Sequence, residues 1–166
     1  MWKVKSKTKP KSNDLVIGCM LVVFLLMVLF PIKRVSGDSM LPTFKDGDWI
    51  ITCRIGRYNY GDVLIALQTD DDGNDALVIK RLVGISSDSV KVSYDGVYRN
   101  EKLLEEDYTL DRTNQIVWEG IIPDDCYFIL GDNRNESYDS RLAGCIKKDR
   151  VVGKVIFNLT EACTVN

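Results

Sequence analysis

A serine in a predicted tight turn is the first residue of this sequence that is suited to chemistry. Ser39 lies in the stretch 36–43 (SGDSMLPT), where Gly37 allows backbone conformations that other residues resist and Pro42 stiffens the following chain. We expect this turn to present the Ser39 hydroxyl and backbone N–H at the head of a cleft. Taken alone, the stretch is also compatible with an ordinary polar linker.

A lysine inside an apolar run is the second such residue. Lys80 and Arg81 interrupt the run 76–84 (ALVIKRLVG). Successive side chains of a strand point to opposite faces, so one of the two basic residues must approach the apolar side. A lysine there loses hydration and its pKa falls, which makes the neutral amine a competent general base near neutral pH. A lysine that reaches solvent from an edge strand fits this run equally well.

A third stretch, 131–141 (GDNRNESYDSR), combines turn-forming residues with charged groups directly after the apolar run 127–130. Asp139 and Arg141 stand two positions apart and can pair, and the Ser137 hydroxyl can donate or accept hydrogen bonds. We interpret the stretch as a loop that orients a catalytic group. The alternative is a polar surface loop.

The absence of histidine restricts the chemistry that these residues can perform. The chain contains no His, which excludes Ser-His-Asp and Cys-His machinery and removes the commonest zinc ligand. A base must therefore be a lysine or a carboxylate, and we expect no metal and no cofactor. The acidic stretch 68–75 (QTDDDGND) is predicted to be a hairpin tip, because Asp75 and Arg81 stand where a calcium loop starting at Asp70 needs glycine and a carboxylate.

The cysteines form no CxxC pair, which disfavours metal clusters and thioredoxin-like chemistry. An exported domain could form one or two disulfides, but the pairing cannot be read from sequence. We expect buried structural thiols at the five cysteine positions: Cys19, Cys53, Cys126, Cys145 and Cys163.

The elements that position these residues are predicted to be strands. The chain has 166 residues, enough for one domain and a short appendage, and its 45% hydrophobic and 28% charged residues are typical of a globular protein. Asp95-Gly96 is a hairpin signal. The fold is therefore expected to be mostly β, with packed antiparallel sheets or a distorted barrel. The predicted strands are 49–54, 62–67, 77–83, 89–94, 116–118, 127–130 and 151–157.

An apolar segment near the N-terminus predicts a membrane anchor. Residues 15–30 carry no charge, and with Pro31 and Ile32 a helix over 15–32 approaches the ~30 Å thickness of a bilayer core. The preceding residues 1–14 form a basic leader, which the positive-inside rule places in the cytoplasm, so residues 33–166 should be extracytoplasmic. A cleavable signal peptide is the alternative.

The charge of the chain is divided between its parts. Residues 1–34 hold seven basic side chains and one acidic one, whereas the remainder holds 15 basic and 23 acidic side chains. An acidic body would be repelled by phosphate, so we expect no nucleic-acid partner.

Taken together, the chain resembles the bacterial type I signal peptidases in six pieces that occur in the family's order. They are the apolar segment, 36–43 (SGDSMLPT), 47–52 (GDWIIT), 61–67 (GDVLIAL), 80–84 (KRLVG) and 131–141 (GDNRNESYDSR). Members of this family are membrane-anchored serine proteases with a Ser-Lys dyad. The resemblance implies that Ser39 is the nucleophile, that Lys80 is its general base and that Ser137 hydrogen-bonds the lysine. It also implies a supporting charged network of Asp139, Arg141 and Arg81, with the Ser39 backbone N–H in the oxyanion hole.

The sequence departs from the family pattern in three places. Gly37 stands where some members carry a serine whose hydroxyl is a second oxyanion donor, and losing such a donor can cost ~3 kcal/mol. Residues 85–88 (ISSD) replace the usual Pro-Gly-Asp turn. The additional domain of larger members is expected to be reduced to a hairpin around residues 89–118.

The resemblance further implies that the substrates are exported preproteins, cut after small residues while bound as an extended strand. The lipid bilayer and the neighbourhood of the secretion translocon are the implied surroundings. Met40, Leu41 and Pro42 are candidates for the substrate cleft, although core packing or lipid contact suits Met40 and Leu41 equally well.

Two other classes of protein remain open. A cytosolic self-cleaving repressor with the same kind of dyad is disfavoured by the anchor. A catalytically inactive relative that acts as an assembly chaperone is disfavoured because both Ser39 and Lys80 are present. A general signal peptidase and one dedicated to a small substrate set are both compatible with the sequence.

Overall fold

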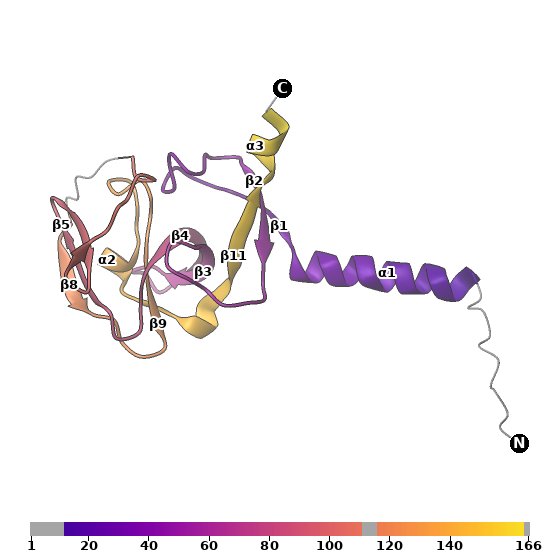
Figure 1. The fold of residues 1–166 in the computed structure, drawn as a ribbon, viewed down its shortest axis with the longest axis horizontal. Coiled ribbons are helices and arrows are strands. Elements are labelled where there is room, and N and C mark those ends of the chain that lie inside the picture. The colour runs from indigo at the N-terminus through magenta and orange to yellow at the C-terminus, as the bar shows by residue number, and fades with distance from the viewer. Residues whose placement is uncertain (1–11, 111–115, 165–166) are drawn as a thin grey trace, which may run out of the picture.

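The fold consists of two antiparallel sheets and a long N-terminal helix that projects away from them (Figure 1). This computed structural model describes residues 12–110 and 116–164. The prediction of a mostly β fold with antiparallel sheets is confirmed.

The larger sheet has seven strands, and each strand is antiparallel to its neighbours. Their order across the sheet is β1 (Ile32–Arg34), β2 (Trp49–Cys53), β11 (Val151–Asn158), β3 (Val63–Thr69), β4 (Asp75–Ile85), β9 (Cys126–Leu130) and β10 (Ile146–Lys147). The predicted acidic hairpin tip is confirmed, because β3 and β4 pair directly on either side of it.

The smaller sheet occupies the region where a hairpin was expected. Its four strands are, in order, β7 (Lys102–Leu103), β6 (Gly96–Arg99), β5 (Ser89–Ser93) and β8 (Trp118–Ile121). The predicted strand 116–118 is wrong apart from its last residue. The turn lies one position earlier than Asp95-Gly96 suggested, because Gly96, at φ +145°, already pairs with Ser93.

Helices are few among the described residues: α1 (Ser12–Leu29), α2 (Ser140–Ala143), the 3-10 turn η1 (Lys148–Arg150) and α3 (Leu159–Thr164). The four cysteines whose side chains the structure describes are free, namely Cys19, Cys53, Cys126 and Cys145. Only Cys53 is buried, so the expectation of buried thiols fails at Cys19 and is met in part at the other two.

The N-terminal helix ends earlier than the predicted segment 15–32. Proline has no N–H and disfavours the α conformation of the residue before it, so α1 stops at Leu29, ahead of Pro31. Ile32 already belongs to β1, which pairs with β2. Within residues 12–110 and 116–164, no helix combines the length and the apolar character needed to cross a membrane, so the expected transmembrane helix is not found. Most of the basic leader lies outside the described residues.

The core that supports the site lies beneath the β1–β4 end of the larger sheet. Met40 and Phe44, which follow the Ser39 turn, are buried there against Ile50 and Ile65. A second cluster, centred on Phe128, joins the smaller sheet to β9. Ser39 is thus attached to one core cluster, and the strand before the loop 131–141 to another.

Candidate active site

The turn that carries Ser39 is held by packing on its C-terminal side. Met40 is fully buried, and the Phe44 N–H donates a hydrogen bond to the Met40 carbonyl at 2.9 Å. Gly37 has a φ of +84°, a conformation that favours glycine, and its N–H donates to Asp46 Oδ1 at 2.8 Å. Ser39 itself stays half-buried, so its hydroxyl remains accessible beside the core.

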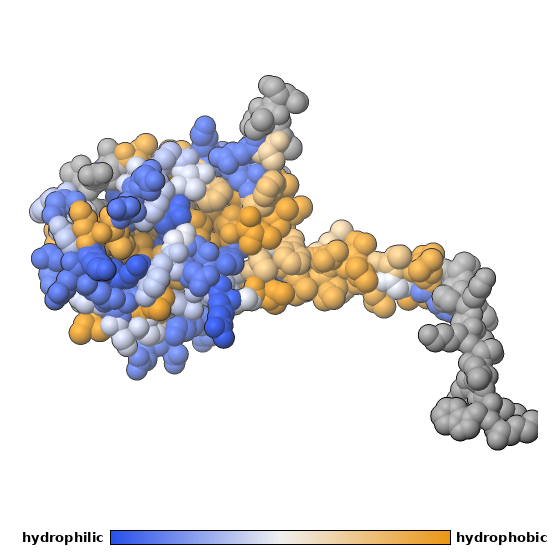
Figure 2. Space-filling model, in the orientation of Figure 1, coloured by the Kyte–Doolittle hydropathy of each residue, from blue (hydrophilic) through white to orange (hydrophobic). Residues whose placement is uncertain are grey.

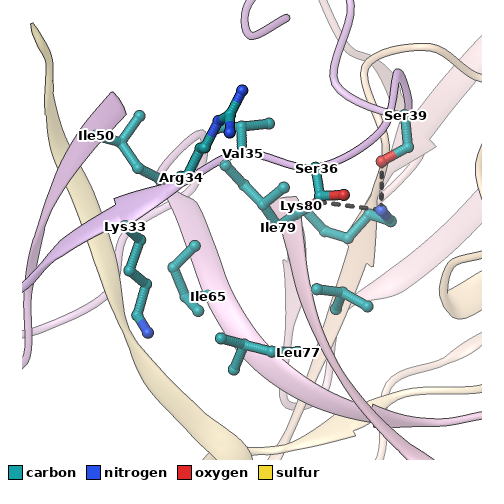
Figure 3. Close-up of a pocket in the computed structure, with 11 residues that line it drawn as sticks. Lys33, Arg34, Val35, Ser36, Ser39, Ile50, Ile65, Leu77, Ile79 and Lys80 are labelled. Carbon is teal, nitrogen blue, oxygen red and sulfur yellow. Dashed lines mark hydrogen bonds between the residues drawn. The ribbon is translucent and has the colours of Figure 1, made fainter. Parts of the chain in front are cut away.

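The Lys80 amine lies against the Ser39 hydroxyl. Lys80 pairs with Leu64 in the β3–β4 ladder, and only 4% of it is exposed. Its Nζ donates hydrogen bonds to Ser39 Oγ at 2.7 Å and to the Ile79 carbonyl at 3.0 Å (Figure 3). The structure thus brings together two residues that are 41 positions apart in the sequence.

Burial lowers the pKa of Lys80 from 10.5 to about 8, because desolvation penalises the charged ammonium. The carboxylates of Asp139 and Asp132 act in the opposite direction and hold the pKa up, whereas Arg141 lowers it further. A sizeable fraction of the amine is therefore neutral at mildly alkaline pH. In that form it can accept the proton of the hydroxyl that it contacts.

Arg81 points to the opposite side of β4 and forms a buried ion pair with Asp132. Its Nε lies 2.8 Å from Asp132 Oδ1 and its Nη2 lies 2.6 Å from Oδ2. The Nη1 group donates to the Gly61 carbonyl at 2.8 Å. The prediction that the two basic residues of this run separate onto different faces is confirmed. The partner of Arg81 is Asp132, a residue that the sequence analysis did not single out.

Asp139 and Arg141 form a second buried ion pair, as their spacing suggested. Arg141 Nε and Nη2 lie 2.8 and 2.9 Å from the two oxygens of Asp139. Asp139 also caps α2 by accepting from the Arg141 backbone N–H, and it accepts from the Gly131 N–H at 2.9 Å. One carboxylate thereby ties both ends of the loop 131–141 together.

The same loop holds the backbone of the serine turn. Asn133 donates its N–H to the Ser39 carbonyl at 3.1 Å and its side-chain amide to the Asp38 carbonyl at 3.2 Å. Sequence reasoning missed this role, although Asn133 lies inside the quoted motif. The position of Ser39 therefore depends on a loop that begins 92 residues later.

Ser137 does not hydrogen-bond the lysine in the structure. Its Oγ is buried and has no hydrogen-bond partner among the described residues. The reason for its proximity to the site is Gly131: a Cβ at that position would lie 2.2 Å from Ser137 Oγ and 2.6 Å from the Ser39 carbonyl oxygen. The absence of a side chain at Gly131 lets the loop pack directly on the serine turn.

Replacing Gly131 with alanine is expected to reduce the free energy of unfolding by about 1–3 kcal/mol, because the new methyl group overpacks a site without free volume. Chemical denaturation of the full chain measures this loss. Gly18→Ala is the matched control, because a Cβ there meets no atom within 4 Å. Equal stability of the two variants would contradict the packing described for Gly131.

A segment from the smaller-sheet side braces the loop and the Arg81 ion pair. Glu106 accepts hydrogen bonds at 2.6 and 3.0 Å from the guanidinium of Arg134, which is itself buried. The Tyr108 hydroxyl donates to Glu106, and its ring lies 3.9 Å from the Arg81 guanidinium carbon. The sequence contained no local signal for this contact, because the segment is far from the three reactive stretches.

A hollow of about 150 Å³ adjoins Ser39 and Lys80. Its described lining consists of Lys33, Arg34, Val35, Ser36, Ser39, Ile50, Ile65, Leu77, Val78, Ile79 and Lys80. The three residues predicted for a cleft do not line it: Met40 belongs to the core, and Leu41 and Pro42 lie beyond the turn. The walls come instead from β1, β2, β3 and β4. Strand alternation predicts which face a side chain takes, but it does not predict which strands surround a hollow.

Comparison with known proteins identifies the class of this site. The family model described as "Signal peptidase, peptidase S26" matches residues 12–160. A crystal structure of a signal peptidase I from Enterococcus faecalis matches with a TM-score of 0.50 and 30% identity, and the match covers 62% of this chain and 99% of that one. The chain is therefore a serine-type peptidase.

Sequence relatives agree with this class. Signal peptidase I of Bacillus licheniformis is 31% identical, over 92% of this chain and 91% of that protein. Signal peptidase I U of Bacillus subtilis is 29% identical, over 90% and 88% respectively, and signal peptidase IB of Staphylococcus aureus is 32% identical over 74% of each chain. The chain belongs to the signal peptidase family, peptidase S26.

Proposed function

We propose that this protein is a membrane-bound serine endopeptidase that removes signal peptides from exported preproteins, with Ser39 as nucleophile and neutral Lys80 as general base. The observation that carries the proposal is the 2.7 Å contact between the buried Lys80 Nζ and Ser39 Oγ. Membership of the signal peptidase family supplies the substrate class.

In the proposed reaction, neutral Lys80 takes the proton of Ser39 as Oγ attacks the carbonyl carbon of the scissile peptide bond. The negative oxygen of the tetrahedral intermediate is stabilised by the Ser39 backbone N–H. The Lys80 ammonium then gives its proton to the leaving amine, and the signal peptide remains as an ester on Ser39. Lys80 next takes a proton from water as the water oxygen attacks the ester carbonyl carbon. The Lys80 ammonium then returns this proton to Ser39 Oγ as the ester bond breaks, which releases the signal peptide and restores the dyad.

A second oxyanion donor must come from a residue other than Gly37. This residue has no side-chain hydroxyl, and its N–H already donates to Asp46. Ser36 lines the hollow and is the nearest hydroxyl-bearing residue in the chain on this side of Ser39. We therefore assign the second donor to the Ser36 hydroxyl.

The charged network is proposed to support the dyad indirectly. Asp139 and Arg141 fix the loop 131–141, and Arg81 with Asp132 fixes the strand that carries Lys80. The Ser137 hydroxyl is buried and has no hydrogen-bond partner among the described residues. We propose that it bonds the Lys80 amine when substrate binding rearranges the site.

The membrane part of the proposal rests on α1. Its apolar side chains are exposed on every face, from Leu15 to Val28, which is costly in water and favourable in lipid. Figure 2 shows this apolar surface continuing onto the adjoining part of the β domain. Exposed Trp49, Ile156 and Phe157 belong to β2 and β11 in that part of the sheet. We propose that α1 attaches the chain to the bilayer, with residues 1–14 cytoplasmic, the β domain extracytoplasmic and the secretion translocon close by.

The test of the function is cleavage of a purified preprotein by the detergent-solubilised full chain. We expect the wild type to release the signal peptide and the variants Ser39→Ala and Lys80→Ala to be inactive while remaining folded. Lys102→Met, at an exposed lysine of the smaller sheet, is the comparison variant for folding. Full turnover by either dyad variant would exclude the assignment, and a folded wild type without turnover would favour a binding role.

A further inference from the structure

A basic residue lines the hollow at a place where an apolar residue would be expected. Lys33 is the middle residue of β1 and pairs with Ile50, which is only 1% exposed. Ile32 and Arg34 on either side are exposed, whereas Lys33 is half-buried, so its side chain lies on the inner face of the strand. Figure 3 shows it running beside Ile65, at the opposite end of the hollow from Ser39.

The charge in the hollow is not balanced. Its described lining includes Lys33, Arg34 and Lys80 but no Asp or Glu. Among the ion pairs of the described residues, none includes Lys33 or Arg34. Burial keeps part of the Lys80 population neutral, and Lys33 is the basic residue of β1 whose side chain lies on the inner face of the strand. The far end of the hollow is thus a cationic site with apolar walls.

We propose that this end of the hollow binds an acidic side chain of the substrate, so that Lys33 determines specificity for a glutamate or aspartate upstream of the scissile bond. The inference rests on the proposed function of Ser39 and Lys80 and names a substrate feature for it. A carboxylate next to Lys33 forms a charge-assisted hydrogen bond, which is stronger beside apolar walls than in open water.

The extended form of the bound substrate should limit the acidic preference to one position of its sequence. A substrate bound in extended form turns alternate side chains toward the hollow and the others away from it. Ser39 and Lys80 fix the scissile bond at one end, and Lys33 lies at the other end (Figure 3). One upstream position is therefore expected to prefer an acidic residue, while its immediate neighbours show no preference. The methylene groups of Lys33 form part of the apolar wall of the hollow, and only its ammonium group contacts the carboxylate.

The experiment uses the detergent-solubilised full chain and a set of signal-peptide substrates. Each substrate carries glutamate or glutamine at one of several positions upstream of the bond. At one position we expect glutamate to give about tenfold higher kcat/KM than glutamine, and we expect high salt to reduce this ratio. Lys33→Met should bring the ratio to about 1, and Lys33→Glu should favour a lysine substrate instead. Lys102→Met, an exposed lysine of the smaller sheet, should leave the ratio unchanged.

Binding of the same peptides to the Ser39→Ala variant separates this inference from the proposed function. A glutamate preference in binding that disappears with Lys33→Met supports the cationic subsite even if the wild type cleaves no peptide. Equal binding and equal cleavage of glutamate and glutamine peptides at every position would overturn it.

Anionic lipid is the other source of negative charge near β1. We would therefore measure binding of wild type and Lys33→Met to vesicles of phosphatidylcholine with and without phosphatidylglycerol. If Lys33→Met weakens binding to the anionic vesicles and leaves the glutamate-to-glutamine ratio at its wild-type value, Lys33 serves the lipid and the specificity inference is wrong.

Discussion

Replacing Lys80 with methionine is expected to lower kcat/KM by about 10²- to 10⁴-fold, the range that a positioned general base contributes. Methionine has a similar length and fills the space of the buried Lys80 side chain, so the fold and the Ser39 turn are retained. The loss should appear in kcat rather than in KM, because Lys80 touches the reacting hydroxyl and not the distant part of the substrate.

The same variant is expected to be more stable than the wild type below about pH 8. The pKa of Lys80 is 10.5 unfolded and about 8 folded, so between these values the unfolded chain binds more protons and wild-type stability rises with pH. Below pH 8 the buried ammonium costs about 3 kcal/mol, which methionine avoids. The two lost hydrogen bonds reduce the advantage.

Denaturation of the two proteins at pH values of about 6 and about 10 tests this prediction. The gap in the free energy of unfolding should shrink as pH rises from 8 toward 10.5. Lys102→Met serves as the control, because it makes the same side-chain change at an exposed position. A gap that is independent of pH would show that Lys80 is not desolvated.

Replacing Asp139 with alanine is expected to reduce the free energy of unfolding by about 3–5 kcal/mol, the cost of leaving a buried charge unpaired. Both partners of the Asp139–Arg141 pair have fully buried side chains. The change also removes the cap of α2 and the acceptor for the Gly131 N–H. Catalysis should fall as well, because the loop that holds the Ser39 carbonyl loses its tie.

Urea denaturation of the full chain measures the effect of Asp139→Ala. The matched variant is Asp75→Ala, which breaks the exposed pair with Arg150 and should cost less than about 1 kcal/mol. Asp139→Asn keeps an acceptor for the cap and is expected to fall between the two. Similar losses for Asp139→Ala and Asp75→Ala would contradict the role given to the buried pair.

Strand alternation and turn chemistry predicted most strands of the larger sheet, but they left open whether Lys80 is buried or reaches solvent. The side chains of Lys80 and Arg81 were predicted to lie on opposite faces, because neighbouring residues of a strand alternate. The structure confirms this. Asp139 and Arg141 were paired correctly because the contact is local. Contacts between residues a few positions apart can be predicted from sequence, because the short connecting chain limits the possible partners of each side chain.

Long-range choices could not be read in the same way. Asp132 was one of many acids that could meet Arg81, and Glu106 and Tyr108 come from a segment with no reactive pattern. Met40 could face a cleft or a core, and only the three-dimensional packing places it in the core. The sequence predicted no role for Lys33, because its place in the hollow depends on the pairing of β1 with Ile50 of β2.

The pH dependence of kcat/KM for preprotein cleavage tests the central claim most directly, because it reports the pKa of the essential base in the free enzyme. If neutral Lys80 activates Ser39, log kcat/KM rises with unit slope and levels off with an inflection near pH 8, and this inflection is missing from the residual activity of Lys80→Met. A flat profile from pH 7 to pH 9 in the wild type, or the same inflection in the variant, would contradict the account.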